Sequence, residues 1–149
     1  LKFIENRFIN KEKDIKLRKG KLIRGDIVIT TRGTVGNIGL YNHNVTFKHM
    51  RINSGMAIFR FKNNNYNIDF YYYLLQSNIF QKQIKRSSYG SAQYQLSVQL
   101  LKKLKIFLIE KNEQNKIAEI LSTTDQKLEL IRERKSKLNR VKKGLMNDL

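Results

Sequence analysis

The chain contains no cysteine, no proline and no tryptophan among its 149 residues. Without cysteine it can form neither a disulfide framework nor a thiolate metal site, a composition that fits the cytoplasm. No uncharged apolar run approaches the roughly 18 residues that a membrane-spanning helix needs, and no signal peptide is visible. We therefore expect a cytoplasmic protein that does not enter a membrane. Because the sequence starts at Leu1 in the middle of a pattern, we also expect it to be a piece of something longer.

Residues that would build a catalytic or metal site are few and scattered. His43 and His49 have no cysteine or carboxylate pair beside them, so we expect no metal site. The six acids before residue 111 do not cluster as a Mg²⁺-dependent nuclease requires. They are Glu5, Glu12, Asp14, Asp26, Asp69 and Glu110. Gly33, Gly36 and Gly39 lack the ending of a phosphate loop and are interpreted as turn residues. We predict a protein without catalytic residues, cofactor or metal.

Positive charge is the abundant property, and it is concentrated in residues 1–110. This part carries 20 Lys and Arg against 6 Asp and Glu, whereas residues 111–149 carry 10 against 6. An AT-rich genome would explain why Lys outnumbers Arg, but not why acids are scarce in one segment. Such an excess is typical of proteins that bind polyanions. Polar groups suited to phosphates and base edges lie at predicted turns, and residues 87–95 add hydroxyls, amides and tyrosines.

The first half of the chain predicts a small β-sheet. Gly25-Asp26 followed by β-branched residues predicts a strand over residues 26–31. The closely spaced glycines predict a tight turn and a second strand near residues 38–41. Alternating side chains predict a third strand over residues 55–61. We expect residues 1–24 to form loop or short helix.

Helices are expected to follow the sheet. The pattern is helical from residue 68 to about residue 84, and the polar insert Gln76-Ser77-Asn78 predicts a break into two helices. Ser97 is expected to cap a helical turn through Lys103, and residues 105–109 to form a last strand. The fold class is therefore α/β with α and β mixed: a small mixed sheet in residues 1–110, followed by a long C-terminal coiled-coil helix.

The last third, residues 111–149, predicts a second domain that is one long helix. About 35 residues from Glu113 to Asn147, with Asn112 as N-cap, would reach roughly 50 Å. Its apolar residues recur in steps of four and three, with Thr124 in register, as in a coiled-coil seam. The helix-pairing residues are Ile117, Leu121, Leu128, Ile131, Leu138 and Leu145. Lys135 and Lys142 interrupt the seam, which favours a short or offset pairing and a role as spacer or dimerisation arm.

Four segments, in this order, carry a family resemblance. They are residues 25–36 (Gly-Asp-Ile-Val-Ile-Thr-Thr-Arg-Gly-Thr-Val-Gly), 52–55 (Ile-Asn-Ser-Gly), 90–97 (Gly-Ser-Ala-Gln-Tyr-Gln-Leu-Ser) and 104–149, which includes Glu113-Gln114 and Ile117-Ala118. The ordered set resembles the specificity subunit of type I restriction-modification systems over about residues 20–149. One departure is that residues 106–109 lack the prolines common in the family before the helix.

The resemblance implies a division of labour. Residues 1–110 would be one target recognition domain that binds double-stranded DNA, and the helix would be the spacer that pairs with a second recognition half or with a homodimer mate. A modification (methyltransferase) subunit would flip and methylate an adenine, and a restriction subunit would join it. The chain itself would be non-catalytic. It would be a half subunit, a C-terminal fragment or a single-domain version that dimerises.

DNA contacts are then assigned by side-chain chemistry. The groups expected near the bases are Arg32, Thr34, His49, Arg51, Ser91 and Gln93. The groups expected at phosphates are Lys19, Lys21, Lys48 and Arg86, and Tyr89 lies in the same interface. An alternative for the tyrosines and Gln93 is that they pack inward or close a turn. Two other functions stay open: a nonspecific nucleic-acid-binding module, and a coiled-coil interaction or oligomerisation protein whose charge only keeps it in solution.

Overall fold

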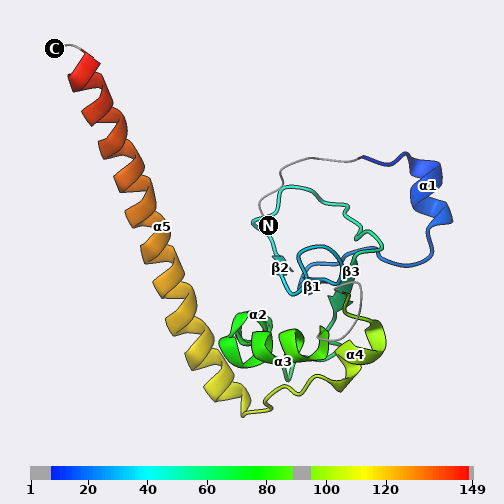
Figure 1. Cartoon of the computed structure of the whole chain (residues 1–149). Coiled ribbons are helices and arrows are strands. Elements are labelled where there is room, and N and C mark those ends of the chain that lie inside the picture. The colour runs from blue at the N-terminus through cyan, green and yellow to red at the C-terminus, as the bar shows by residue number, and fades with distance from the viewer. Residues whose placement is uncertain (1–7, 89–94, 148–149) are drawn as a thin grey trace.

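The computed structural model describes residues 8–88 and 95–147 (Figure 1). The elements are α1 (Lys11–Lys16), β1 (Asp26–Thr30), β2 (Ile38–Tyr41), β3 (Met56–Phe59), α2 (Ile68–Gln76), α3 (Asn78–Ser88), α4 (Val98–Lys103) and α5 (Lys111–Asn147). The mixed α/β fold with a long C-terminal helix is therefore confirmed. Within the described residues, no helix has the length and apolar character to cross a membrane.

The sheet is antiparallel, and its strands lie in the order β2-β1-β3. Asp26 pairs with Tyr41 in β2, and Thr30 at the other end of β1 pairs with Met56 in β3. The central strand is buried on both faces, which explains its unbroken apolar run. Ile27 packs toward the helices, while Val28 packs against Tyr41 in a second, smaller core.

Helices α2 and α3 cover one face of the sheet (Figure 1). Their buried residues Phe70, Tyr71, Leu75, Phe80 and Ile84 share one core with β1. The predicted break falls at Ser77, whose amide bonds to Leu74 O and whose Oγ accepts from Phe80 N. Ser97 caps α4 as predicted, because its hydroxyl accepts from Leu100 N at 3.2 Å.

Helix α5 has 37 residues, about 55 Å at 1.5 Å per residue. It projects away from the rest of the described chain, which we call the body (Figure 1). It begins at Lys111, so Asn112 lies in its first turn and is not the N-cap that we predicted. The first turns are anchored by buried Gln114 and Ala118. From Thr123 onward every described residue of the helix is exposed.

The predicted strand over residues 105–109 is wrong. These residues form neither helix nor strand, and they run between α4 and α5 beside α3 rather than along an edge of the sheet. The side chain of Gln83 on α3 bonds both to Lys105 N at 3.0 Å and to Lys105 O at 2.9 Å. A side-chain amide thus makes the bonds that a neighbouring strand would have made.

Candidate nucleic-acid interface

The turn between β1 and β2 carries Arg32 and Thr34 at one end of the sheet. Thr30 N donates to Asn37 O at 3.0 Å, and Gly36 N donates to Thr30 O at 2.9 Å. Gly36 has φ +92° and lies against α3, where only a residue without Cβ fits easily. Arg32 and Thr34 are both exposed, so the turn presents them to solvent on a hydrogen-bonded base.

Arg32 is held in place by a residue that we did not predict. Residues 32 and 95 form an isolated antiparallel bridge, and Leu96 N donates to Thr31 O at 2.9 Å. With its amide oxygen turned toward the guanidinium, Gln95 accepts from Arg32 Nε and Nη2 at 3.1 Å each. Gln95 belongs to the segment 90–97 that carries the family resemblance, and that position was the available signal.

Lys48 and His49 are exposed on the loop between β2 and β3. The backbone of this loop is hydrogen-bonded to the side chains of Arg24 and Tyr41. The Arg24 guanidinium stacks 4.2 Å from the centre of the Tyr41 ring and donates to three loop carbonyls, among them Val45 O at 2.9 Å. Tyr41 Oη donates to Phe47 O at 2.7 Å. The loop backbone is therefore fixed while the side chains of Lys48 and His49 face outward.

Arg51 has a structural role that the sequence did not indicate. Its Nε donates to the Asp14 carboxylate, its Nη2 donates to Asp14 O at 2.7 Å, and its Nη1 donates to Lys19 O at 2.8 Å. Lys21 Nζ lies 3.1 Å from the same carboxylate. The hydrogen bonds from Arg51, and then from Lys21, lower the pKa of Asp14. Arg51 therefore fastens the segment that carries α1, and its assignment as a base contact stays a prediction.

Three further predicted DNA contacts lie in two places. Lys19 and Lys21 are exposed beside Arg51, whereas Arg86 is exposed on α3 and lines a groove together with Phe107. Tyr89, Ser91 and Gln93, together with Tyr94, lie outside the described residues. Their assignments stay predictions.

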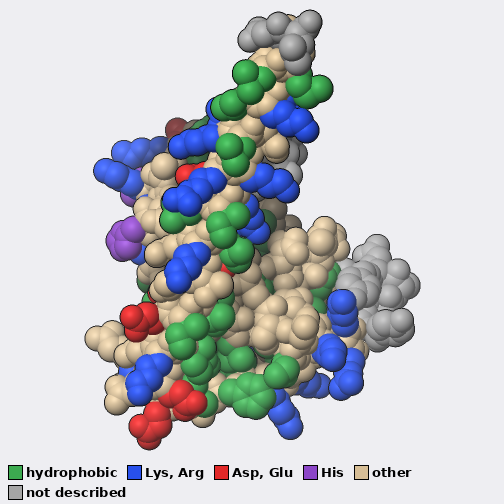
Figure 2. Space-filling model, turned by 90° about the vertical axis from the view of Figure 1, so that its left-hand side faces the viewer, with side chains coloured by type: hydrophobic (Ala, Val, Ile, Leu, Met, Phe, Trp, Pro, Cys, Tyr) green, Lys and Arg blue, Asp and Glu red, His purple; other side chains and the backbone are tan. Residues whose placement is uncertain are grey.

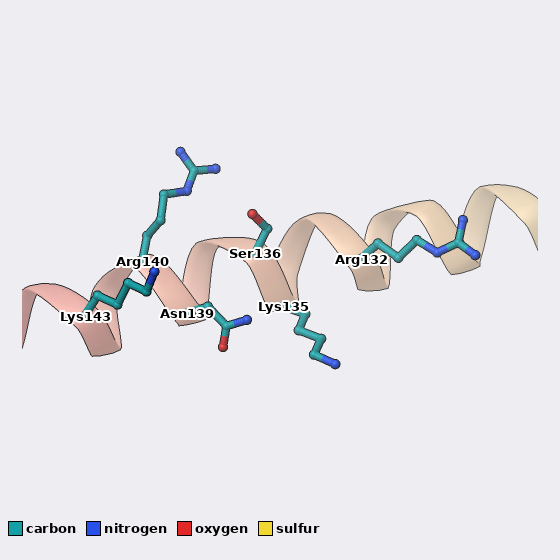
Figure 3. A pocket seen from close by; sticks show the side chains of 6 residues that line it. All are labelled: Arg132, Lys135, Ser136, Asn139, Arg140 and Lys143. Carbon is teal, nitrogen blue, oxygen red and sulfur yellow. The ribbon is translucent and has the colours of Figure 1, made fainter. Parts of the chain in front are cut away.

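Helix α5 carries a second group of cations. Arg132, Lys135, Ser136, Asn139, Arg140 and Lys143 surround a shallow hollow on its exposed half (Figure 3). Arg140 and Lys135 point to opposite sides of the helix, so the cations do not converge on one bound anion. Within the described chain, no group of three or more His, Cys, Asp or Glu could hold a metal ion.

The predicted pairing stripe is exposed over most of its length. Leu128 is 44% exposed and Leu138 69% exposed, and Leu121, Ile131 and Leu145 are exposed as well. Figure 2 shows hydrophobic side chains following α5 with Lys and Arg on both sides. Ile117 differs, because it packs against the core of the body. The available stripe thus starts at Leu121.

Comparison with known proteins places this chain in a family. The family described as "Type I restriction modification DNA specificity domain" matches residues 2–140. The chain belongs to that family. A putative type I restriction enzyme MjaX specificity subunit from Methanocaldococcus jannaschii is 35% identical, over 93% of this chain and 33% of its own length. The type I restriction enzyme MjaVIII specificity subunit of the same organism is 33% identical, over 60% of this chain and 21% of its own length.

The specificity-domain family covers both the body and most of α5. The chain spans a third or less of the length of these relatives. Gln114, which we quoted only as part of the resemblance, is one of the residues that join α5 to the body. Its Oε1 accepts from Asn67 N at 2.7 Å and its Nε2 donates to Ile109 O at 2.8 Å. Hydrogen bonds of Gln114 therefore connect the start of α2, residue 109 and α5.

Proposed function

We propose that the chain recognises a short sequence of double-stranded DNA and is the non-catalytic specificity component of a type I restriction-modification complex. The observation that carries this proposal is Arg32, which is exposed on a turn of the sheet and held by Gln95. Family membership and the net charge of +18 support the same function. Modification and restriction subunits would supply methylation and cleavage.

Arg32 has the chemistry of a base reader. A guanidinium has five N–H donors, and Gln95 uses one on Nε and one on Nη2. The remaining donors on Nη1 and Nη2 lie side by side at the tip, which suits the O6 and N7 acceptors of guanine in the major groove. Thr34 and His49 are proposed beside it, with Ser91, Gln93 and Tyr89 completing the interface. Lys19, Lys21, Lys48 and Arg86 are proposed to contact phosphates.

Two substitutions distinguish sequence-specific recognition from nonspecific electrostatic affinity for DNA. Arg32→Lys keeps the charge and removes the fork, so the preference for the cognate duplex over a scrambled one should fall by about 5- to 150-fold. Lys48→Gln should weaken both duplexes alike and reduce the slope of log affinity against log salt by about 1. The cognate duplex is first obtained by selection from a random-sequence pool and measured by fluorescence anisotropy. If selection enriches no motif, the chain is a nonspecific nucleic-acid-binding module.

The exposed stripe of α5 is proposed to pair antiparallel with another such helix. All described acids of α5 lie between Glu113 and Glu133, whereas residues 134–147 contain six Lys and Arg and no acid. An antiparallel pair places acid near base, while a parallel pair places like near like. If Leu128 faces Ile131 of the second helix, Asp125 lies beside Arg132 of that helix. Pairing of this kind would fix the separation of two recognition domains.

Leu128→Lys tests the pairing, with Leu130→Lys as its control. Leu130 is 57% exposed but lies off the stripe, so the two variants add the same charge at different helix faces. Sedimentation equilibrium should show weakened self-association for Leu128→Lys alone. Equal association for both variants would contradict the stripe as a pairing surface, without affecting the DNA measurement.

A further inference from the structure

Residues 105–109, the segment for which we wrongly predicted a strand, are bonded to the body in an alternating pattern. Every second carbonyl accepts a hydrogen bond from a side chain of α2, α3 or α5. The bonds join Lys105 O to Gln83 at 2.9 Å, Phe107 O to the Tyr71 hydroxyl at 3.5 Å and Ile109 O to Gln114 at 2.8 Å. The amide of Lys105 is also bonded, to Gln83. Peptide groups that alternate in this way are typical of an extended chain.

Ile106 and Leu108, which lie between these residues, have no such bonds. The structure gives the N–H and C=O groups of both residues no partner within the described chain. Their side chains are 40% and 72% exposed. The segment therefore resembles an edge strand whose carbonyls on one side are bonded to side chains and whose other side has no partner among the described residues. Such an edge can accept another strand.

A groove with a mixed lining lies beside this edge. Ile79 from α3, Ile106 and Phe107 are its exposed apolar residues, 57%, 40% and 55% exposed. Lys82, Arg86 and Lys105 also line it, and no acid does. Phosphates need the cations but not the apolar surface, and a second copy of this chain would bring the same cations against each other. The lining fits an occupant with apolar and acidic side chains.

We propose that residues 105–109 are a docking edge for an extended segment of a partner protein, in which apolar and acidic residues alternate. The main chain of the segment would bond to the free groups of Ile106 and Leu108. Its apolar side chains would cover Ile79 and Phe107, and its carboxylates would face the cations. This surface is separate from the turn of Arg32 and shares only Arg86 with the proposed DNA contacts, so binding of the partner segment does not depend on base recognition.

A labelled peptide of about ten residues with alternating isoleucine and glutamate is the probe, added to the full chain at physiological salt. Fluorescence anisotropy should show saturable binding, and hydrogen exchange at the amides of Ile106 and Leu108 should slow. The same peptide with lysine in place of glutamate should bind at least about tenfold more weakly because of the cations. A version with proline at every second position should also bind more weakly, since it lacks ladder donors.

Two variants locate the binding. Lys105→Glu reverses one lining charge and should weaken the glutamate peptide by about tenfold or more. Val98→Ser is the control, because Val98 is 62% exposed on α4 and does not line the groove. The docking edge is wrong if both variants bind the peptide like the parent, or if no peptide binds. It is also wrong if a DNA duplex displaces the peptide completely in the parent, since the groove would then be a phosphate site.

Discussion

Replacing Gln114 by leucine should loosen the junction between the body and α5. Gln114 is 2% exposed, and its amide bonds to Asn67 N at 2.7 Å and to Ile109 O at 2.8 Å. Asn67 is also the N-cap of α2, so one side chain joins α2, α5 and residue 109. Leucine fills a similar volume, and the loss is therefore confined to hydrogen bonding.

The expected cost follows from the groups left without partners. Each buried polar group deprived of its bond costs about 1–3 kcal/mol. Asn67 and Ile109 are partly exposed, so water can recover part of that cost. We expect Gln114→Leu to lower the free energy of unfolding by about 2–4 kcal/mol. Asn115→Ala removes only the exposed 2.8 Å bond to Asn67 Nδ2 and should cost less than about 1 kcal/mol.

Urea unfolding followed by circular dichroism measures both variants at one protein concentration, because helix pairing would otherwise shift the midpoint. The m-value must stay constant for the two free energies to be compared. If Gln114→Leu lies within about 0.5 kcal/mol of Asn115→Ala, the buried amide does not stabilise the junction. Apolar packing of Ile117 and Ala118, together with the exposed hydrogen bonds of α5, would then anchor the helix.

Further predictions concern pH and turn geometry. The pKa of Asp14 is lowered by Arg51, so the contribution of Asp14 to folding stability is present above pH 3.8 and is lost as the pH falls below that value. Asp14→Asn should lose the same contribution near neutral pH. The loss should be seen as faster hydrogen exchange in residues 11–22. Burial raises the pKa of Tyr73 to about 12, so stability should fall as the pH rises above 10, and Tyr73→Phe should remove that loss in alkaline unfolding curves. Gly36→Ala, which meets α3 at 3.0 Å, should lower the melting temperature more than Gly33→Ala, which meets nothing within 4 Å.

Local sequence signals predicted most of the secondary structure. The β2 strand, the break at Ser77 and the cap at Ser97 each depend on neighbouring residues, and all three were confirmed. The long helix was also predicted, although it begins at Lys111 rather than Glu113. The prediction of a strand over residues 105–109 was wrong for a reason that local sequence does not contain. Its apolar residues favour extended chain, but a strand also needs a neighbour, and here the neighbour is the side chain of Gln83.

The sequence by itself determined the charge, the absence of cysteine chemistry, the helix periodicity and the family. The tertiary structure decided which cations are available to a ligand. Arg32 and Arg51 looked equivalent, since both are arginines near predicted turns. Folding places Asp14, 37 positions earlier, against Arg51, whereas among the described residues the guanidinium of Arg32 faces the neutral amide of Gln95. A charged partner takes up the donors and offsets the charge of one arginine, while a neutral partner orients the other without offsetting its charge.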